Sequence, residues 1–266
     1  MRKERLDVLV TSLGLFESRE AAKRAIMAGI VLVNNEPIDK AGTKVPVDAE
    51  IRIKGAVMPY VSRGGYKLEA AIKAFNLDLT DKIIIDVGAS TGGFTDCALQ
   101  NGAKLSYAVD VGYNQLAWKL RQDDRVISME RMNFRHMTIE DLPHEKPTFA
   151  CMDVSFISIK LLLPVLKELL AEHGDLVALI KPQFEAGKAH VGKKGIVRDA
   201  KVHQTVITEI GEFCRALGLV PIGLTHSPIK GGEGNIEFLI HLGFSGEDTV
   251  TPALITEVVK KAHNGL

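Results

Sequence analysis

The sequence predicts an α/β protein in which a doubly wound, seven-stranded mixed sheet follows a small α+β domain. From residue 66 onwards, short apolar runs alternate with stretches long enough for helices, as in a sheet with right-handed crossovers. Only about nine residues ("PIKGGEGNI") separate the last two apolar runs, too few for a parallel crossover, so the final strand should be antiparallel. Residues 1–54 have a pattern of their own, which indicates a separate domain.

The first 54 residues predict two helices followed by short strands. Apolar residues recur one helical turn apart from residue 6 to residue 13, and Gly14 can end this helix. Ser18 is a suitable N-cap for a second helix, "REAAKRAIMA", which Gly29 can terminate. "IVLVNNEPI" then predicts strand, turn and strand, because asparagine tolerates the left-handed backbone of tight turns. "AEIRIK" alternates in polarity and predicts another strand.

Four basic residues of this domain are candidates for contact with nucleic acid: Arg5, Arg19, Lys23 and Arg24. A charged helix face is usually only solvated, so the spacing of these residues does not by itself indicate binding to nucleic acid. The succession "RLDVLV…SREAAKRAIMAGIVLVNNEPI", however, resembles the RNA-binding domain named after ribosomal protein S-four. This resemblance implies binding of structured RNA, with these cations contacting phosphates.

A linker at residues 55–65, rich in glycine and without periodicity, is expected to join this domain to a larger one at 66–266. The strand-like runs of the larger domain are "KIIIDVG", "LSYAVDV", "RVISM", "TFACMDV", "DLVALIKP", "LVPIGLTHS" and "EFLIHLGF". Helices are expected between them at 93–101, 115–121, 159–172 and 200–216. Six parallel strands and a final antiparallel one resemble the Rossmann-like sheet of the S-adenosylmethionine-dependent methyltransferases.

The first strand runs into a glycine-rich loop, "DVGASTGGFTD", at residues 86–96. A dinucleotide-binding loop needs glycine at the middle position of G-x-G-x-x-G, so that the backbone can approach a pyrophosphate. Here that position is Ser90, whose side chain would crowd a pyrophosphate. S-adenosylmethionine carries no phosphate and tolerates a serine there. A strand-to-helix turn without a ligand stays the alternative.

Further residues near this loop suit the same cofactor. Asp110 ends the next strand, where it can accept both ribose hydroxyls, and Asp86 can face the cofactor's ammonium group. Asn133 lies where this fold usually contacts adenine, although an ordinary loop asparagine is the alternative. Phe94 packs either on the cofactor or on the sheet. The predicted cofactor-binding set is Asp86, Gly88, Ser90, Thr91, Gly92, Gly93, Phe94, Asp110, Asn133 and Asp153.

Charged residues stand at four positions that should meet at one edge of the sheet. Asp153 and Lys181 end strand-like runs, Glu237 begins the antiparallel one, and Lys67 begins the first helix of the larger domain. The carboxyl ends of parallel strands form the ligand crevice of such sheets. Two cations and two anions at this edge are better explained by a site than by solvated strand ends.

These four residues match the K-D-K-E catalytic tetrad of the FtsJ-like ribose 2′-O-methyltransferases. The motifs "YVSRGGYKL", "DVGASTGGFTD", "DVSFIS", "IKPQFEAG" and "KGGEGNIEFL" closely resemble the TlyA family, described both as haemolysins and as ribosomal RNA methyltransferases. The resemblance covers essentially the whole chain. It implies S-adenosylmethionine as cofactor, 2′-O-methylation of cytidine as activity, and ribosomal RNA or ribosomal subunits as partners.

Within this tetrad, the resemblance implies that Lys181 acts on the ribose 2′-hydroxyl, whose proton must be accepted or whose developing charge must be stabilised. An ordinary lysine, with a pKa of about 10.4, is protonated at neutral pH and cannot accept a proton. Neighbouring carboxylates favour the charged form, and a neighbouring lysine opposes it. A role as base and a role as electrostatic stabiliser both stay open.

The stretch 181–201 has six Lys/Arg against two Asp/Glu, together with three glycines. A solvated loop is the default interpretation, but beside Lys181 the stretch also suits a lid that grips RNA phosphate through Lys188, Lys193 and Lys194. The edge of the sheet is expected to hold few aromatic residues, so residues 1–54 should supply most of the RNA affinity.

Composition excludes several other classes of protein. The chain has 33 Lys/Arg against 33 Asp/Glu, so nucleic-acid binding must rely on local patches. The three cysteines lack ligand spacing, and neither a metal site nor a disulfide framework is expected. The N-terminus lacks a signal-peptide core, and no apolar run reaches the ~18–20 residues of a membrane helix. We therefore expect a cytoplasmic protein without membrane contact; the alternatives are a pore-forming haemolysin and an RNA-binding protein with an inactive methyltransferase domain.

Overall fold

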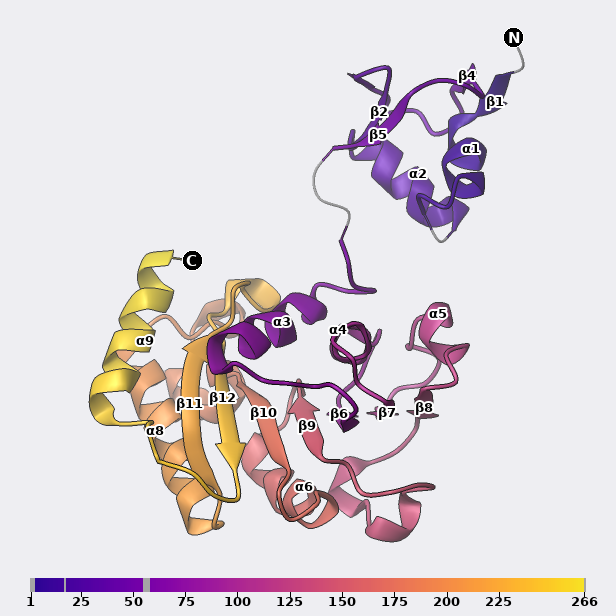
Figure 1. Ribbon diagram of the computed structural model, residues 1–266. Helices are drawn as coiled ribbons and strands as arrows, with labels where there is room; N and C mark the ends of the chain where they lie inside the picture. The colour runs from indigo at the N-terminus through magenta and orange to yellow at the C-terminus, as the bar shows by residue number, and fades with distance from the viewer. Residues whose placement is uncertain (1–2, 17, 55–57, 266) are drawn as a thin grey trace. The chain divides into compact units, whose positions relative to one another are not determined.

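The computed structural model describes residues 3–16, 18–54 and 58–265, which belong to two compact units, Met1–Pro59 and Tyr60–Leu266 (Figure 1). The division falls within the interval 55–65 in which the sequence places the linker. Residues 55–57, at the start of that interval, lie outside the described residues. Across the three described ranges, no helix combines the length and the apolar character needed to cross a membrane.

The first unit is a small α+β domain with two helices and two small sheets. Its elements are β1 (Lys3–Arg5), α1 (Leu6–Ser12), α2 (Arg19–Met27), β2 (Val31–Val33), β3 (Glu36–Pro37), β4 (Lys44–Pro46) and β5 (Ile51–Ile53). Strands β3, β2 and β5 form one sheet, and β1 pairs with β4. The Ser18 side chain accepts a hydrogen bond from the Ala21 N–H, and Asn34 and Asn35 have φ of 53° and 68°, so the predicted cap and turn are confirmed. The β1–β4 pair was not predicted.

The second unit contains the predicted seven-stranded mixed sheet, in the order β11-β12-β10-β9-β6-β7-β8. Strand β12 runs antiparallel to both of its neighbours, whereas the pairs among β10, β9, β6, β7 and β8 are parallel. The strands are β6 (Ile83–Val87), β7 (Leu105–Val109), β8 (Val126–Met129), β9 (Phe149–Met152), β10 (Asp175–Ile180), β11 (Val220–His226) and β12 (Phe238–Gly243).

The helices of this unit differ from the predicted ones at four places. The α-helices are α3 (Gly64–Phe75), α4 (Gly93–Gln100), α5 (Trp118–Arg121), α6 (Leu163–Leu169), α7 (Pro182–Glu185), α8 (Ala200–Ala216) and α9 (Pro252–Gly265). The helix expected at 115–121 is a single turn, and the one expected at 159–172 begins at Leu163, after a 3-10 turn. Proline fits only the first turn of a helix, so Pro164 fixes that start. Helices α7 and α9 were not predicted.

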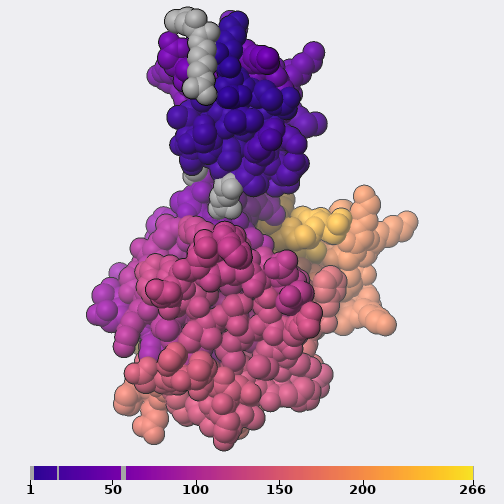
Figure 2. All heavy atoms as spheres, turned by 90° about the vertical axis from the view of Figure 1, so that its right-hand side faces the viewer, coloured from indigo at the N-terminus to yellow at the C-terminus, as the bar shows by residue number. Residues whose placement is uncertain are grey.

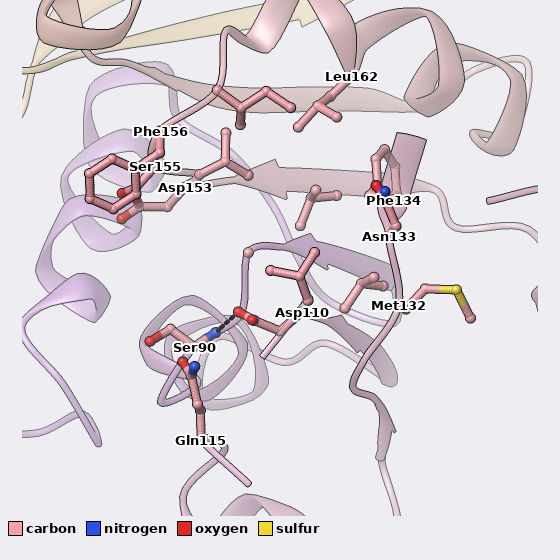
Figure 3. Close-up of a pocket in the computed structure, with 16 residues that line it drawn as sticks. Ser90, Asp110, Gln115, Met132, Asn133, Phe134, Asp153, Ser155, Phe156 and Leu162 are labelled. Carbon is pink, nitrogen blue, oxygen red and sulfur yellow. Dashed lines mark hydrogen bonds between the residues drawn. The ribbon is translucent and has the colours of Figure 1, made fainter. Parts of the chain in front are cut away.

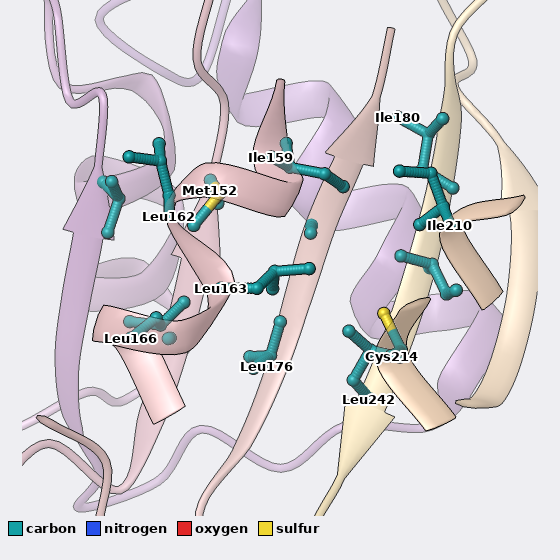
Figure 4. Packing of buried hydrophobic residues seen from close by; sticks show 14 of the residues in the cluster. Met152, Ile159, Leu162, Leu163, Leu166, Leu176, Ile180, Ile210, Cys214 and Leu242 are labelled. Atoms are coloured by element: carbon teal, nitrogen blue, oxygen red, sulfur yellow. The ribbon is translucent and has the colours of Figure 1, made fainter. Parts of the chain in front are cut away.

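Two hydrophobic cores cover the two faces of this sheet. Along β6, Ile83, Ile85 and Val87 belong to one core and Ile84 to the other, as the alternation of side chains along a strand requires. Figure 4 shows the first core, where side chains of α6 and α8 pack on the strands. The second core contains residues of α3, α4 and α5, and Figure 2 shows the molecule from the side of β8 and α5. With both faces covered, ligands can reach the sheet at its carboxyl edge.

Candidate active site

Five charged residues lie at the carboxyl edge of the sheet, four of them at the ends of strands and one on a helix. Asp110 directly follows β7, Asp153 follows β9 and Lys181 follows β10. Glu237 directly precedes β12 and reaches the same edge because β12 is antiparallel to β10. The first turn of α3 brings Lys67 to this edge from a different layer.

Lys67, Asp153, Lys181 and Glu237 form one buried network of ion pairs, which we call the tetrad. Lys67 Nζ lies 3.0 Å from Asp153 Oδ2 and 2.9 Å from Glu237 Oε2. Lys181 Nζ lies 2.5 Å from Asp153 Oδ1 and donates a hydrogen bond of 2.9 Å to Ser155 Oγ. The side chains of both lysines are 9% exposed, and that of Glu237 is 2% exposed. Asp153 is therefore shared by two buried cations.

The surrounding charges favour the ionised forms of Lys67 and Asp153. Burial alone would lower the pKa of Lys67, but the carboxylates of Asp153 and Glu237 raise it above its ordinary value. Burial alone would raise the pKa of Asp153, but Lys67 and Lys181 together hold it below its ordinary value. The edge of the sheet thus carries fixed, poorly hydrated charges, which interact strongly with any polar group that enters.

Beside the tetrad lies a cavity of about 350 Å³, within the size range of small-molecule sites (Figure 3). Gly88, Ser90 and Asp110 line one side of it, Asn133 lines another, and Asp153 connects it to the tetrad. The Asp110 carboxylate accepts hydrogen bonds of 2.7 Å from the N–H groups of Ser90 and Gly112, one on each oxygen. Each oxygen keeps a lone pair for a hydroxyl donor, so Asp110 suits a ribose diol and would repel a phosphate.

The glycines of the 86–96 loop mainly allow protein segments to approach one another. Gly88 has φ of 85°, and a Cβ there would lie 2.5 Å from the Asp153 carbonyl oxygen. Gly92 has φ of 96°, and a Cβ there would lie 2.2 Å from a methyl carbon of Leu120. Among the predicted residues of the loop from 88 to 93, Gly88 and Ser90 line the cavity, whereas Gly92 and Gly93 do not.

Asp86 and Phe94, two other predicted cofactor residues, lie beneath the loop and not on the cavity wall. Asp86 is 1% exposed, and its Oδ2 accepts hydrogen bonds from the N–H and the hydroxyl of Thr95, at 3.0 and 2.8 Å. Among the residues that the structure describes, Asp86 Oδ1 has no hydrogen-bond partner, and burial raises the pKa of this carboxyl to about 7. Phe94 is 3% exposed and packs in the core beside α3. Thr91 also lies off the cavity wall.

A second hollow, of about 800 Å³, adjoins the first and contains residues that sequence reasoning missed. The two hollows share Phe156, whose side chain is 90% exposed and whose ring centroid lies 5.1 Å from that of Phe184. Two aromatic rings therefore lie at this edge, and neither was among the predicted site residues. The motif "DVSFIS" contained the signal, because it has an aromatic residue four positions after the end of β9.

Gln183 was also missed, and it joins the second hollow to the tetrad. Its Nε2 donates a hydrogen bond of 3.3 Å to Glu237 Oε1, and its Oε1 is buried without a partner among the described residues. Arg135 and Lys188 line the same hollow. The second hollow therefore combines two aromatic rings, two cations and an amide next to the tetrad.

In the first unit, three of the four predicted RNA-contacting cations have protein partners. Arg5 and Arg19 form ion pairs of 3.0 and 2.9 Å with Asp7, whose side chain is fully buried. The hydrogen bond from Arg5 is the main reason why the pKa of Asp7 falls to about 2. Lys23 forms an ion pair of 2.6 Å with Glu20, and Arg24 is exposed. The remaining candidates, Lys188, Lys193 and Lys194, are exposed between α7 and α8.

Comparison with known proteins matches both units. The FtsJ-like methyltransferase family matches residues 60–244, and the S4 domain matches residues 4–51. The chain is 58% identical to a Bacillus subtilis protein named rRNA methyltransferase YqxC, over 100% of this chain and 96% of that protein. It is 35% identical to the Mycobacterium tuberculosis 16S/23S rRNA (cytidine-2'-O)-methyltransferase TlyA, over 98% and 97%. A solved structure named as a hemolysin from Streptococcus thermophilus has a TM-score of 0.78 and 53% identity, over 100% and 97%.

Proposed function

The chain belongs to the family of FtsJ-like methyltransferases that carry an S4 domain, and we propose that it transfers a methyl group from S-adenosylmethionine to the 2′-oxygen of a cytidine ribose in ribosomal RNA. The observation that carries this proposal is the cavity that ends at Asp153, the carboxylate shared by two buried lysines. A nucleoside cofactor in that cavity would lie directly beside fixed charges suited to a reacting hydroxyl.

The wall of the cavity supports the choice of cofactor. Asp110 would accept hydrogen bonds from the ribose hydroxyls, while Asn133 is available for a base edge. The apolar residues Val111, Met132 and Leu162 would exclude water from the rest of the cofactor. S-adenosylmethionine would supply an electrophilic methyl group. Asp86, beneath the loop, would act by holding the loop through Thr95, without touching the cofactor.

The tetrad would act on the acceptor hydroxyl. Lys181 is held between Asp153 Oδ1 and Ser155 Oγ, so its ammonium group has a fixed position. This ion pair favours a role for Lys181 as a cationic stabiliser of the developing negative charge on the 2′-oxygen, with water taking the proton. Lys67 would keep Asp153 and Glu237 in place, since it pairs with both.

The second hollow would receive the acceptor nucleotide. Aromatic rings bind unpaired bases by stacking, and the rings of Phe156 and Phe184 lie at the border with the cofactor cavity. Arg135 and Lys188 on the same wall would pair with backbone phosphates. An RNA substrate therefore suits the chemistry of this wall better than a small apolar acceptor. Ribosomal RNA as substrate would place the enzyme in the cytoplasm.

The two units would divide the work. Residues 1–54 would supply RNA affinity, residues 55–65 would serve as linker, and residues 66–266 would carry out the chemistry. The match of residues 4–51 to the S4 domain supports the first part of this division.

The test is a methylation assay on isolated ribosomal subunits with isotopically labelled S-adenosylmethionine, followed by mapping of the modified riboses. The proposal predicts label on a cytidine 2′-oxygen with the wild type and none with Lys181→Ala. Lys82→Ala is the matched control, because Lys82 also pairs with an aspartate, Asp175, but at the start of β10. Label on a base, or equal labelling by Lys181→Ala, would contradict the proposal.

A further inference from the structure

The loop at residues 186–199, between α7 and α8, carries four exposed cations: Lys188, Lys193, Lys194 and Arg198. We call it the basic loop. It starts five residues after Lys181 of the tetrad. Near its other end Val197 is buried, with 2% of its surface exposed. The basic loop is therefore anchored beside the tetrad at one end and in the core at the other.

The side chain of Asn235 joins the buried end of the basic loop to another segment of the chain. Asn235 is 2% exposed, and its Oδ1 accepts a hydrogen bond of 3.0 Å from the N–H of Val197. Its Nδ2 donates to the carbonyl oxygens of Gly195, at 2.9 Å, and Gly232, at 3.2 Å. The amide thus uses both its acceptor and its donors to join the basic loop to the segment that precedes β12.

That segment packs directly on the tetrad. Asn235 stands two residues before Glu237, and its carbonyl oxygen accepts a hydrogen bond of 2.9 Å from the N–H of Gly231. A Cβ on Gly231 would lie 2.0 Å from Glu237 Oε1, so the backbone here touches the catalytic carboxylate. A change at Asn235 would therefore reach the basic loop and the neighbourhood of Glu237 together.

His203 of α8 holds the same point of the basic loop from the other side. Its Nε2 lies 3.2 Å from the Val197 carbonyl oxygen, and its Nδ1 lies 3.0 Å from His263 Nε2 on α9. The ring is fully buried against Phe238, so the neutral form is favoured. The Val197 carbonyl can only accept, which makes Nε2 the protonated nitrogen of His203. Both polar groups of the Val197 backbone are then paired, one with Asn235 and one with His203.

We propose that Asn235, supported by His203, is a positioning residue that fixes the basic loop beside Lys181 and Glu237, so that its cations meet the backbone of the RNA substrate. This inference rests on the proposed function. A loop that is already held at Val197 loses less conformational freedom when it grips phosphate than a free loop would. The cations themselves would contact RNA, whereas Asn235 would act only through the loop.

The main test is the steady-state kinetics of Asn235→Ala in the full-length chain, with ribosomal subunits as substrate. We expect KM for the subunits to rise roughly ten- to a hundredfold, because misplaced binding groups lose effective contact, while the dissociation constant of S-adenosylmethionine stays within about twofold. Asn235→Asp keeps the acceptor for Val197 and loses both donors, so its KM should lie between those of the wild type and Asn235→Ala. Asn101→Ala is the control, because Asn101 Nδ2 also donates to a backbone carbonyl, that of Cys97 in α4.

A coupling experiment separates positioning from a general loss of stability. Asn235→Ala is combined with Lys193→Ala and Lys194→Ala, and the effects on KM are compared. If Asn235 acts through these lysines, the combined effect is clearly smaller than the product of the separate effects. Effects that multiply fully would overturn the proposal.

Hydrogen exchange gives a readout that does not depend on activity. In Asn235→Ala the amides of residues 186–199, above all that of Val197, should exchange at least about tenfold faster than in the wild type, while those of β6 and β7 keep their protection. Unchanged exchange in the basic loop would refute the proposal even if the wild type methylates no RNA. Absence of methylation by the wild type would count against the proposed function alone.

Discussion

Each unit of the molecule contains a carboxylate that is shared by two cations, and the two clusters differ in the exposure of those cations. The side chain of Asp7 is fully buried and that of Asp153 is 19% exposed. Asp153 lies between two lysines whose side chains are 9% exposed. Asp7 lies between two arginines whose side chains are 46% and 52% exposed. The exposure of the cations, and not the presence of the ion pairs, separates the two clusters.

This difference indicates what each cluster can do. Even a paired buried ion adds little net stability, because its desolvation offsets the attraction of its partner. The lysines beside Asp153 are therefore poorly explained by stability alone and are better explained by a ligand that uses their charge. The arginines beside Asp7 keep much of their hydration. Their inner N–H groups hold the carboxylate, and their outer N–H groups remain available to solvent or to a phosphate.

The largest expected effect is that of Asp153→Asn on catalysis. Without the negative charge, Lys67 and Lys181 are left as neighbouring buried cations, and we expect the methylation rate to fall by about 10²- to 10³-fold. The measurement is single-turnover transfer of labelled methyl groups to ribosomal subunits. A rate within about fivefold of the wild type would show that this shared carboxylate is structural, like Asp7.

His203 sharpens the comparison because it is fully buried and, among the residues that the structure describes, forms no ion pair. Burial lowers its pKa to about 4, against about 6.5 when unfolded, so only the unfolded state binds the proton between these values. Its contribution to stability is complete above pH 6.5 and is lost as the pH falls towards 4, by up to about 3 kcal/mol.

Urea denaturation of the wild type and of His203→Gln between pH 8 and pH 4 checks this pH dependence. The difference in the free energy of unfolding between the wild type and His203→Gln should change by up to about 3 kcal/mol over this range. The variant should become more stable relative to the wild type as the pH falls. His173→Gln, at an exposed position, is the control and should follow the wild type. A difference that does not vary with pH would contradict the prediction.

Asp7→Asn should affect stability and leave the chemistry intact. The loss of two charge-assisted hydrogen bonds is expected to destabilise the first unit by about 2 kcal/mol. Hydrogen exchange of the α1 and α2 amides in the full-length chain measures this, and calorimetry should find unchanged affinity for S-adenosylmethionine. Unaltered exchange in α1 would show that Asp7 does not support the fold of its unit.

Asp110→Ala tests the wall of the cofactor cavity, outside both clusters. The change leaves two ribose hydroxyls without their acceptor, which should cost about 1–3 kcal/mol, so we expect the dissociation constant of S-adenosylmethionine to rise roughly five- to a hundredfold. Isothermal titration calorimetry measures it. Affinity equal to that of the wild type would remove Asp110 from the cofactor site.

The smallest expected effect is on the salt dependence of RNA binding. Arg24→Ala should reduce the slope of log affinity against log salt by ~0.7–0.9 with no loss of stability, if Arg24 contacts one phosphate. Arg19→Ala should reduce the slope and also destabilise the first unit, because Arg19 holds Asp7. Lys104→Ala, at an exposed position of the other unit, is the control. Identical slopes for Arg24→Ala and the wild type would leave the basic loop as the main candidate for RNA contact.

Much of the fold could be predicted because its signals are local. Apolar alternation identified the strands of the large sheet, and the short connection before β12 gave its direction. Local patterns failed where other parts of the chain decide the structure. Strand β1 has three residues and exists only through its pairing with β4, and α5 is reduced to one turn. For α9 the signal was present, since Ile255, Val258, Val259 and Ala262 recur at helical spacing and are buried.

The sequence alone determined which residue types stand at the strand ends, because the order of residues along the chain fixes which residue precedes or follows each apolar run. Tertiary structure alone decided which side chains touch. Lys67 and Glu237 are 170 residues apart and form an ion pair of 2.9 Å, and no local pattern relates them. Burial likewise placed Asp86 and Phe94 beneath the cofactor loop and left Phe156 exposed. The strength of the interaction between two charges depends on their hydration, and hydration is fixed only once helices and sheet have packed together.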